Sequence, residues 1–385
     1  MRFGAFAAAL LSALSIASYG ATLGSDKFVS RTGTHIQSAR IGNQFLRSGS
    51  TPADFLMQND IKGQSPMATP FNSLARVDSA VGVTRDAPVD INGDGKTDFV
   101  VTRDEGGSLI WYYAQNGGTD WTGTRWGLST DWALSEDFDG DGKDDYVVWR
   151  PDANGSVFYI YFTATGAYRA EVFGQEGDVP SVIGDYDGDG VADIAVYRPG
   201  ATDGAQSYWF YIPSNNNPSH TAVSVPWGIR NDILAPGDYN GDGKNDFGIA
   251  RNDGSGHLVF WFLLSDGTVA PAVTFGTTAD LVVPGDYDGD GKTDIATVRS
   301  VNGQYQWQYY ASSNGTINYG VWGSAGDLPA QGDYDGDGKT DFAIYRRSST
   351  PGQTGFWVLN SSNFSVTSFA WGQQGDVPVA TSNVF

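Results

Sequence analysis

The chain has no cysteine and only 3 histidines among its 385 residues, and its 23 basic residues are outnumbered by 44 acidic ones. Without cysteine there are no disulfides, so stability has to come from packing or from bound metal. The formal net charge of −21 argues against nucleic acid or an anionic membrane as the main partner. His35, His220 and His257 stand apart, and no GxSxG, HExxH or cysteine nucleophile occurs. We therefore expect that the protein is not an enzyme.

Long apolar runs are missing too, except at the start of the chain. Arg2 precedes an apolar and small-residue run over Phe3–Ala17, and Ser18–Ala21 offers small residues for cleavage. About 15 apolar residues are too few for a membrane-spanning helix, which needs ~20. The sequence therefore predicts a signal peptide over residues 1–20, a secreted, extracellular protein and no membrane insertion. Residues 21–80, rich in Ser, Thr, Gln, Asn and Gly, are expected to form a partly ordered N-terminal extension.

Glycine and aromatic residues are abundant, with 51 Gly, 12 Trp, 19 Tyr and 21 Phe, a composition typical of short strands and tight turns. A nine-residue motif, DxDGDGxxD with small variations, occurs six times at spacings of 47, 48, 53, 48 and 47 residues. Such a period indicates a solenoid, a propeller or an array. We number the copies loops 1 to 6: Asp90–Asp98, Asp137–Asp145, Asp185–Asp193, Asp238–Asp246, Asp286–Asp294 and Asp333–Asp341.

Other positions repeat in register with the loops. An arginine follows each first Asp by thirteen residues: Arg103, Arg150, Arg198, Arg251, Arg299 and Arg346. Each unit ends with an aromatic residue before Gly: Trp126, Phe173, Trp227, Phe275, Trp322 and Trp371. Another Asp stands five residues further on: Asp131, Asp178, Asp232, Asp280, Asp327 and Asp376. We expect each Arg to pair with an Asp as a structural clamp between strands or adjacent blades; a ligand-binding ring is the alternative.

Each unit reads as four short strands, which predicts an all-β propeller of six blades of four antiparallel strands, with seven blades as the alternative. The first strand precedes the loop, as in Leu281–Val283, and the second follows it, as in Ile194–Tyr197. The third is aromatic, as in Trp307–Tyr310, and we expect these side chains to pack mainly between blades. Gly375–Ala380 copies the opening of a unit, so this C-terminal strand is expected to close the ring on the first blade.

The loops have the oxygen donors that Ca²⁺ prefers. Positions 1, 3, 5 and 9 supply side-chain oxygens, position 7 supplies its backbone carbonyl, and Gly at positions 4 and 6 permits a tight wrap. An EF-hand is excluded because position 12 is Val, Ile or Thr in every copy, never Glu. The predicted ligands are Asp90, Asn92, Asp94, Lys96, Asp98, Asp137, Asp139, Asp141, Lys143, Asp145, Asp185, Asp187, Asp189, Val191, Asp193, Asp238, Asn240, Asp242, Lys244, Asp246, Asp286, Asp288, Asp290, Lys292, Asp294, Asp333, Asp335, Asp337, Lys339 and Asp341.

The alternatives to calcium are weaker. One such loop alone would pass for a polar turn, but six sets of crowded carboxylates would repel one another without a cation. Magnesium prefers fewer carboxylates and keeps its waters. The ligand positions hold 22 Asp, half of the 44 acidic residues, so about six Ca²⁺ would bring the net charge from −21 to −9.

With these loops between first and second strands, and with Phe173-Gly174 and Phe275-Gly276, residues 81–385 resemble the FG-GAP/VCBS repeat family, also found in integrin α-subunit heads and some lectins. Four units have Trp-Gly instead of Phe-Gly, and Gly-Asp-Val/Leu-Pro stands where the family name suggests Gly-Ala-Pro. The resemblance implies a calcium-stiffened propeller for adhesion or ligand binding, without naming the ligand. We expect a monomer that binds carbohydrate or a cell-surface protein. The alternatives are a protein-interaction or structural surface module and, less favoured, a polysaccharide lyase.

Overall fold

The structure, a computed structural model, describes residues 87–118, 120–215, 217–350 and 352–380. These residues form 23 strands and no helix, and so the described part of the chain offers no helix suited to crossing a membrane. The predicted signal peptide, residues 1–20, and the predicted extension, residues 21–80, lie outside the described residues. So do residues 81–86 and 381–385 at the two ends of the predicted propeller domain.

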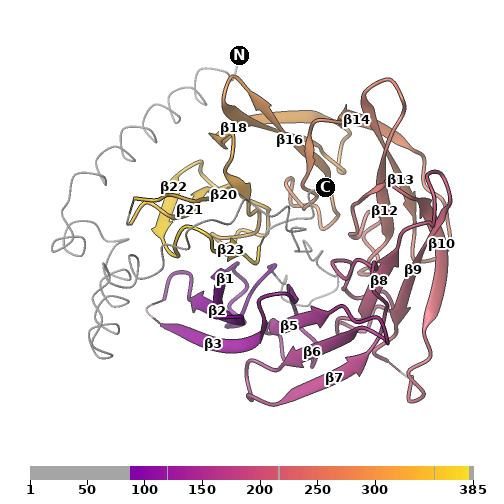
Figure 1. Ribbon diagram of the computed structural model, residues 1–385. Helices are drawn as coiled ribbons and strands as arrows, with labels where there is room; N and C mark the ends of the chain where they lie inside the picture. Colours follow the sequence, from indigo (N-terminus) through magenta and orange to yellow (C-terminus); the bar gives the residue numbers. More distant parts are fainter. Residues whose placement is uncertain (1–86, 119, 216, 351, 381–385) are drawn as a thin grey trace.

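Six antiparallel sheets are arranged as the blades of a propeller around a common centre (Figure 1). From the inner to the outer strand, blade 1 consists of β23 (Val377–Pro378), β1 (Phe99–Glu105), β2 (Ser108–Ala114) and β3 (Trp121–Leu128), and blade 2 of β4 (Trp132–Glu136), β5 (Asp145–Arg150), β6 (Val157–Tyr161) and β7 (Tyr168–Val172). Blade 3 consists of β8 (Ile194–Arg198), β9 (Gln206–Ile212) and β10 (Val223–Ile229), and blade 4 of β11 (Ile233–Leu234), β12 (Phe247–Asn252), β13 (His257–Leu263) and β14 (Val273–Thr277). Blade 5 consists of β15 (Leu281–Val282), β16 (Ile295–Val301), β17 (Gln304–Tyr310) and β18 (Ile317–Ser324), and blade 6 of β19 (Leu328–Pro329), β20 (Phe342–Arg346), β21 (Gly355–Leu359) and β22 (Val366–Ala370). In blade 3 the inner strand is reduced to a bridge between Val179 and Tyr197.

The prediction of an all-β, six-bladed propeller is confirmed, and so is its closure by the C-terminal strand. β23 pairs with β1 in the first sheet, with Thr102 opposite Val377 and Val101 opposite Pro378. The amide of Val379 extends this pairing by donating to the carbonyl of Val100 at 3.0 Å. Because the last strand completes the first blade, the ring leaves no inner sheet edge open at this junction.

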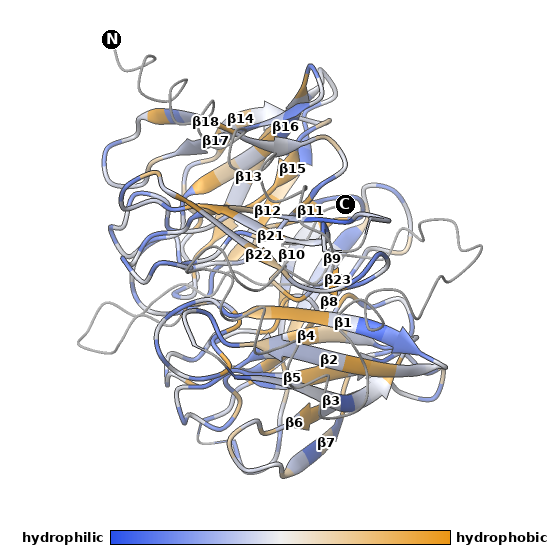
Figure 2. Cartoon of the chain, turned by 90° about the vertical axis from the view of Figure 1, so that its left-hand side faces the viewer, coloured by the Kyte–Doolittle hydropathy of each residue, from blue (hydrophilic) through white to orange (hydrophobic). Residues whose placement is uncertain are grey.

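The core is divided among the blade interfaces. Each of the six buried apolar clusters combines residues of two neighbouring blades, one cluster at every junction around the ring. In Figure 2 the hydrophobic colour follows the strands, whereas the connecting loops are mostly hydrophilic. Trp111, Trp209 and Trp307 of the third strands are at most 1% exposed, so these aromatic side chains pack between blades as expected.

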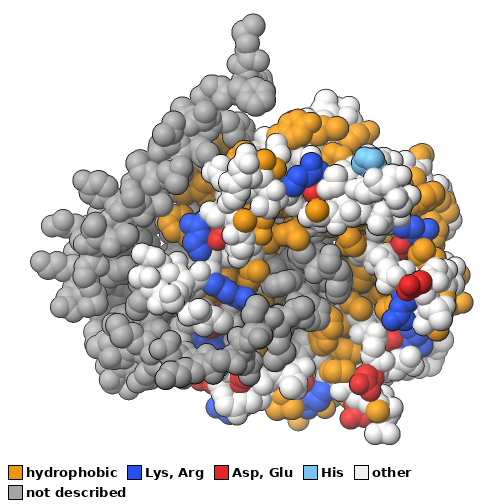
Figure 3. Space-filling view, turned by 45° about the horizontal axis from the view of Figure 1, so that its top comes forward, with side chains coloured by type: hydrophobic (Ala, Val, Ile, Leu, Met, Phe, Trp, Pro, Cys, Tyr) orange, Lys and Arg blue, Asp and Glu red, His pale blue; other side chains and the backbone are white. Residues whose placement is uncertain are grey.

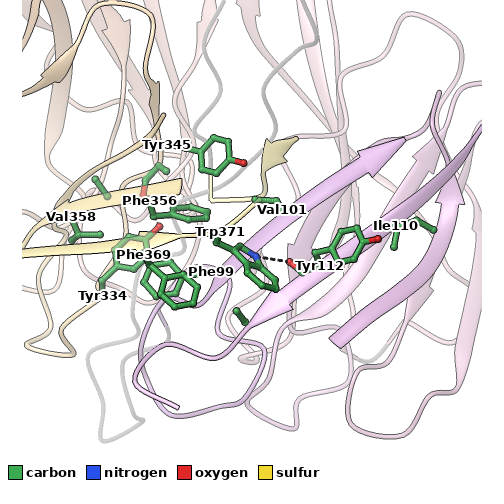
Figure 4. Close-up of a cluster of buried hydrophobic side chains, with 13 residues drawn as sticks. Phe99, Val101, Ile110, Tyr112, Tyr334, Tyr345, Phe356, Val358, Phe369 and Trp371 are labelled. Carbon is green, nitrogen blue, oxygen red and sulfur yellow. Dashed lines mark hydrogen bonds between the residues drawn. The ribbon is translucent and has the colours of Figure 1, made fainter. Parts of the chain in front are cut away.

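The cluster at the closing junction shows how the two ends of the propeller are held (Figure 4). Phe99 of β1 stacks on Phe369 of β22, with ring centroids 4.5 Å apart. Trp371, from the last aromatic-Gly pair, donates its indole N–H to the carbonyl of Tyr112 at 3.3 Å. Aromatic burial of this kind contributes roughly 2–3 kcal/mol per side chain, so the junction is held by packing as well as by strand pairing.

The predicted Arg–Asp clamps are present in all six blades, and each joins the first and second strands of one blade. Arginine Nε and Nη2 contact the two carboxylate oxygens at 2.6–2.9 Å. The aromatic-Gly pair serves the same clamp, because the amide after each Gly donates to the Asp carboxylate at 2.7–2.9 Å. At Gly127 (φ +99°) an added Cβ would lie 2.8 Å from Val148, so this turn requires glycine.

Candidate metal centres

Loops 1 to 6 lie at the start of the second strand of each blade, and the first Asp of each folds the loop around its own carboxylate. In loop 3, Asp185 accepts the amides of Gly188 and Gly190 at 2.5 and 2.8 Å. The equivalent pairs of bonds occur in the other five loops at 2.6–2.8 Å. The glycines at positions 4 and 6 all have φ between +76° and +85°, a conformation that other residues rarely adopt. The sequence-based role of these glycines is therefore confirmed.

The ninth-position Asp holds the loop by accepting hydrogen bonds from two backbone amides. In loop 3, Asp193 accepts the amide of Tyr186 at 3.0 Å on one oxygen and the amide of Ser214 at 2.6 Å on the other. The same two kinds of bond occur in every loop. These six carboxylates are at most 1% exposed. A carboxylate has about four acceptor sites, so these two bonds leave sites for a cation. In loop 1 the amide of Asn92 also bonds to both oxygens of Asp98.

The carboxylates of one loop converge. In four loops, three carboxylates have oxygens within 4.8 Å of one another: Asp137, Asp139 and Asp145; Asp185, Asp187 and Asp193; Asp286, Asp288 and Asp290; and Asp333, Asp335 and Asp341. In loops 1 and 4 the third position is Asn, and the amide of Asn92 donates to both oxygens of Asp98 at 3.1 and 2.9 Å. Turning that amide over would present its oxygen instead, so the asparagines fit a cation as well.

Burial and mutual repulsion disfavour the ionised form of these carboxylates. Burial, reinforced by neighbouring loop carboxylates, raises the pKa of Asp145, Asp193 and Asp294 to about 7, against an ordinary 3.8. Burial likewise raises the pKa of Asp246 and Asp341 to about 7 and that of Asp333 to about 6. A bound divalent cation would favour the ionised form. The all-oxygen donor set, with no nitrogen or sulfur, suits a hard cation and fits calcium.

Sequence reasoning missed the contribution of the turns between third and fourth strands. Ser265, Ser312 and Ser361 each donate a hydroxyl to the fifth-position Asp of their blade's loop at 2.8–2.9 Å. Ser313 and Ser362 donate to the third-position Asp. These hydroxyls hold the exposed carboxylates in the loop. A signal was present, because the second residue after each third strand is always Asn, Thr or Ser.

The six loops are also joined to one another in a closed belt. The eighth-position amide of each loop donates to the first-position carbonyl of the preceding loop at 2.6–2.9 Å: Thr97 to Asp333, Asp144 to Asp90, Ala192 to Asp137, Asn245 to Asp185, Thr293 to Asp238 and Thr340 to Asp286. Residues of neighbouring blades thus contact the backbone of a predicted ligand in every loop. The belt passes through the closing junction, where loop 1 bonds to loop 6.

The other residues singled out in the sequence lie apart from the loops. The Arg–Asp clamps occupy the far end of the second strands, where they form ion pairs within blades. His220 contacts Glu171 at 3.0 Å and His257 contacts Asp253 at 3.2 Å, and both imidazoles are exposed. His35 lies outside the described residues.

Comparison with known proteins identifies the repeats. A model of the FG-GAP-like repeat matches residues 137–196 and 238–297. Each match starts at the first Asp of one loop and runs through the next loop into the following second strand, so the two matches contain loops 2 to 5. No curated protein matches the chain.

Solved structures show distant likenesses. The acylaminoacyl peptidase of Pyrococcus horikoshii is 9% identical with a TM-score of 0.34, over 63% of this chain and 46% of that one. An acylaminoacyl peptidase in complex with Z-Gly-Gly-Phe-chloromethyl ketone is 9% identical with a TM-score of 0.33, over 70% and 52%. A triple arginine-to-alanine variant of AofleA from Arthrobotrys oligospora is 11% identical with a TM-score of 0.39, over 80% and 97%. The chain spans about half the length of the two peptidases, and TM-scores this low assign no function.

Proposed function

We propose that this six-bladed propeller, two stretches of which match the FG-GAP-like repeat, binds about six Ca²⁺, one in each of loops 1 to 6, and serves as a rigid interaction module. The observation that carries the proposal is the convergence of carboxylates, several of them buried, in loops whose backbone is already folded around them. Calcium supplies the positive charge that such carboxylates need in order to ionise while buried.

The chain's own residues prepare each loop for the ion. In loop 6, Asp333, Asp335 and Asp341 would contribute carboxylate oxygens, while the carbonyl of Lys339 remains a predicted ligand. Ser361 and Ser362 orient the exposed carboxylates by hydrogen bonds. Preorganised donors of this kind lower the ordering cost of binding.

Calorimetric titration of the metal-free protein tests the proposal. We expect Ca²⁺ to bind at several sites per chain, and Mg²⁺ at equal concentration to compete poorly, because it prefers fewer carboxylates and dehydrates reluctantly. An Asp185→Asn, Asp193→Asn variant, which weakens loop 3 alone, should lose about one site. Absence of calcium heat in the wild-type protein would refute the proposal.

We further propose that the propeller binds carbohydrate, in an adhesive role. Aromatic rings at the junction of blades 1 and 2 support this. Tyr168 of β7 is 68% exposed, and its ring centroid lies 5.7 Å from that of Trp126, which in turn lies 5.3 Å from Tyr161. Exposed aromatic faces of this kind suit stacking on sugar rings. On the face seen in Figure 3, hydrophobic side chains form several separate patches rather than one broad apolar area of the sort that favours a protein partner.

A glycan array probed with wild-type protein and with a Tyr168→Ala variant tests this second proposal. Calcium-dependent hits that Tyr168→Ala weakens would support it. An array without hits would instead favour the protein-interaction or structural reading that the repeat family alone suggests. The predicted export signal would bring the loops to extracellular calcium. That the chain is not an enzyme stays a prediction.

A further inference from the structure

The side chain of the seventh residue of each loop lies over the preceding loop, whereas its backbone belongs to its own loop. Lys96, Lys244 and Lys339 donate their ammonium groups to the third-position carbonyls of loops 6, 3 and 5 at 2.9–3.0 Å. The stems of Lys143 and Lys292 pass within 3.1–3.3 Å of where a Cβ on Gly93 or Gly241 would stand. Five of the six loops therefore have a lysine from the next blade over them.

Loop 2 is the exception. The residue above it is Val191, whose Cγ2 lies 3.1 Å from the position of a Cβ on Gly140. Loop 2 has Asp at all four side-chain ligand positions, and a methyl group takes the place that an ammonium occupies over loops 3, 5 and 6. Arg169 of β7, whose guanidinium interacts electrostatically with Asp145, is the cation that its own blade brings near this loop.

We propose that the seventh residue of each loop sets the calcium affinity of the preceding loop, and that lysine there lowers it. The inference rests on the proposed calcium binding. The physical reason is direct: an ammonium bonded to the backbone of a ligand residue lies close to the ion and repels it. In the metal-free state the same ammonium offsets the repulsion among the carboxylates, so it stabilises the empty loop relative to the loaded one.

The proposal makes opposite predictions for two single substitutions. Lys244→Met keeps the hydrocarbon stem but removes the charge over loop 3, and should raise the calcium affinity of loop 3 about three- to tenfold. Val191→Lys adds a charge over loop 2 and should lower the affinity of loop 2 by a similar factor. Arg169 is untouched in both variants, so its influence on loop 2 cancels from the comparison.

The measurement needs a reporter for each loop, and the sixth-position glycine amides provide one. The amides of Gly142 and Gly190 donate to the first-position Asp of loops 2 and 3 at 2.8 Å, so calcium bound to that Asp will shift their NMR signals. Calcium titrations of full-length protein labelled with ¹⁵N-glycine then give a dissociation constant for each loop. Arg125→Met, which removes an exposed cation from outer strand β3, controls for net charge, and melting curves establish that each variant is folded.

The outcomes separate the inference from the function beneath it. Tighter binding at loop 3 in Lys244→Met, with the other loops and Arg125→Met unchanged, supports the inference. Unchanged or weaker binding at loop 3 overturns it, since the lysine would then be a structural support, while calcium binding itself stands. The Val191→Lys arm decides the matter independently should Lys244→Met fail to fold. If no glycine signal shifts with calcium in the wild-type protein, the proposed function fails as well.

Discussion

Arg103 and Asp376 are 273 residues apart in sequence, and their side chains form a bidentate ion pair with both N···O distances at 2.7 Å. Their side chains are 5% and 1% exposed, whereas the arginines of the other five clamps are 34–36% exposed. Arg103 lies in β1 and Asp376 directly precedes β23. This pair therefore fastens the C-terminal strand to the first blade, in a setting where loss of either partner would bury an uncompensated charge.

The first prediction compares this closing clamp with an internal one. Arg103→Ala should lower the free energy of unfolding by about 3–5 kcal/mol because it leaves Asp376 buried without its partner. Arg198→Ala, in a more exposed clamp, should cost about 1–2 kcal/mol. Denaturant unfolding measures both, with the exposed Arg125→Ala as the neutral control. Equal and negligible losses would show that the clamps are not structural.

The second prediction concerns the glycine beside the closing clamp. Gly372 has φ +97°, and an alanine Cβ there would meet the hydroxyl of Tyr345 and lie 2.8 Å from Asp376 Oδ2. Gly375 has φ +105° but open space around its Cβ position. Gly372→Ala should therefore destabilise by about 2–4 kcal/mol, and Gly375→Ala by about 1 kcal/mol from backbone strain alone. Similar melting temperatures for the two variants would contradict this account of the turn.

Much of this architecture can be predicted from the sequence because the structural unit repeats. Six copies of one unit fix the blade count, and the unit-like segment Gly375–Ala380 at the C-terminus predicts the closure. What escapes prediction is contact between units. That Lys96 reaches the carbonyl of Asp335, or that Lys244 reaches the carbonyl of Asp187, depends on how neighbouring blades meet in space, which no spacing within one unit encodes. The reduction of the inner strand of blade 3 to a single bridge at Val179 has no evident cause in the sequence.

The third prediction is that calcium supplies the stabilisation that disulfides provide in other proteins and that this chain, which has no cysteine, cannot obtain from them. At millimolar calcium and site constants of ~10⁻⁵ to 10⁻⁴ M, each ion adds about 1.4–2.7 kcal/mol. Chelation should therefore lower the melting temperature by more than about 10 °C, and added calcium should restore it. Magnesium at the same concentration is the control and should restore little. A melting temperature indifferent to chelation would rule this role out.

The fourth prediction is a reversed pH dependence in the metal-free protein. Burial raises the pKa of Asp193 and Asp294 to about 7, so the folded state binds protons more tightly than the unfolded state between about pH 4 and 7. The free energy of unfolding should then fall as pH rises through this window. With saturating calcium the ionised form is favoured, and stability should instead fall as pH is lowered.

Thermal melts at pH 4.5, 5.5 and 7.0, with and without calcium, measure this crossing of slopes. Asp294→Asn cannot ionise at this position, so in the metal-free protein its free energy of unfolding should depend less steeply on pH. A metal-free protein that becomes more stable from pH 4.5 to 7.0 would contradict the electrostatic account of the loops.

The central claim is that the converging carboxylates of loops 1 to 6 exist to hold calcium. The most direct measurement is elemental analysis of purified protein after equilibrium dialysis against buffer containing millimolar calcium, with the free calcium of the dialysate subtracted. The account predicts about six calcium ions per chain, falling by about one when loop 3 is disabled by Asp185→Asn and Asp193→Asn together. Protein that retains no calcium under these conditions would contradict it.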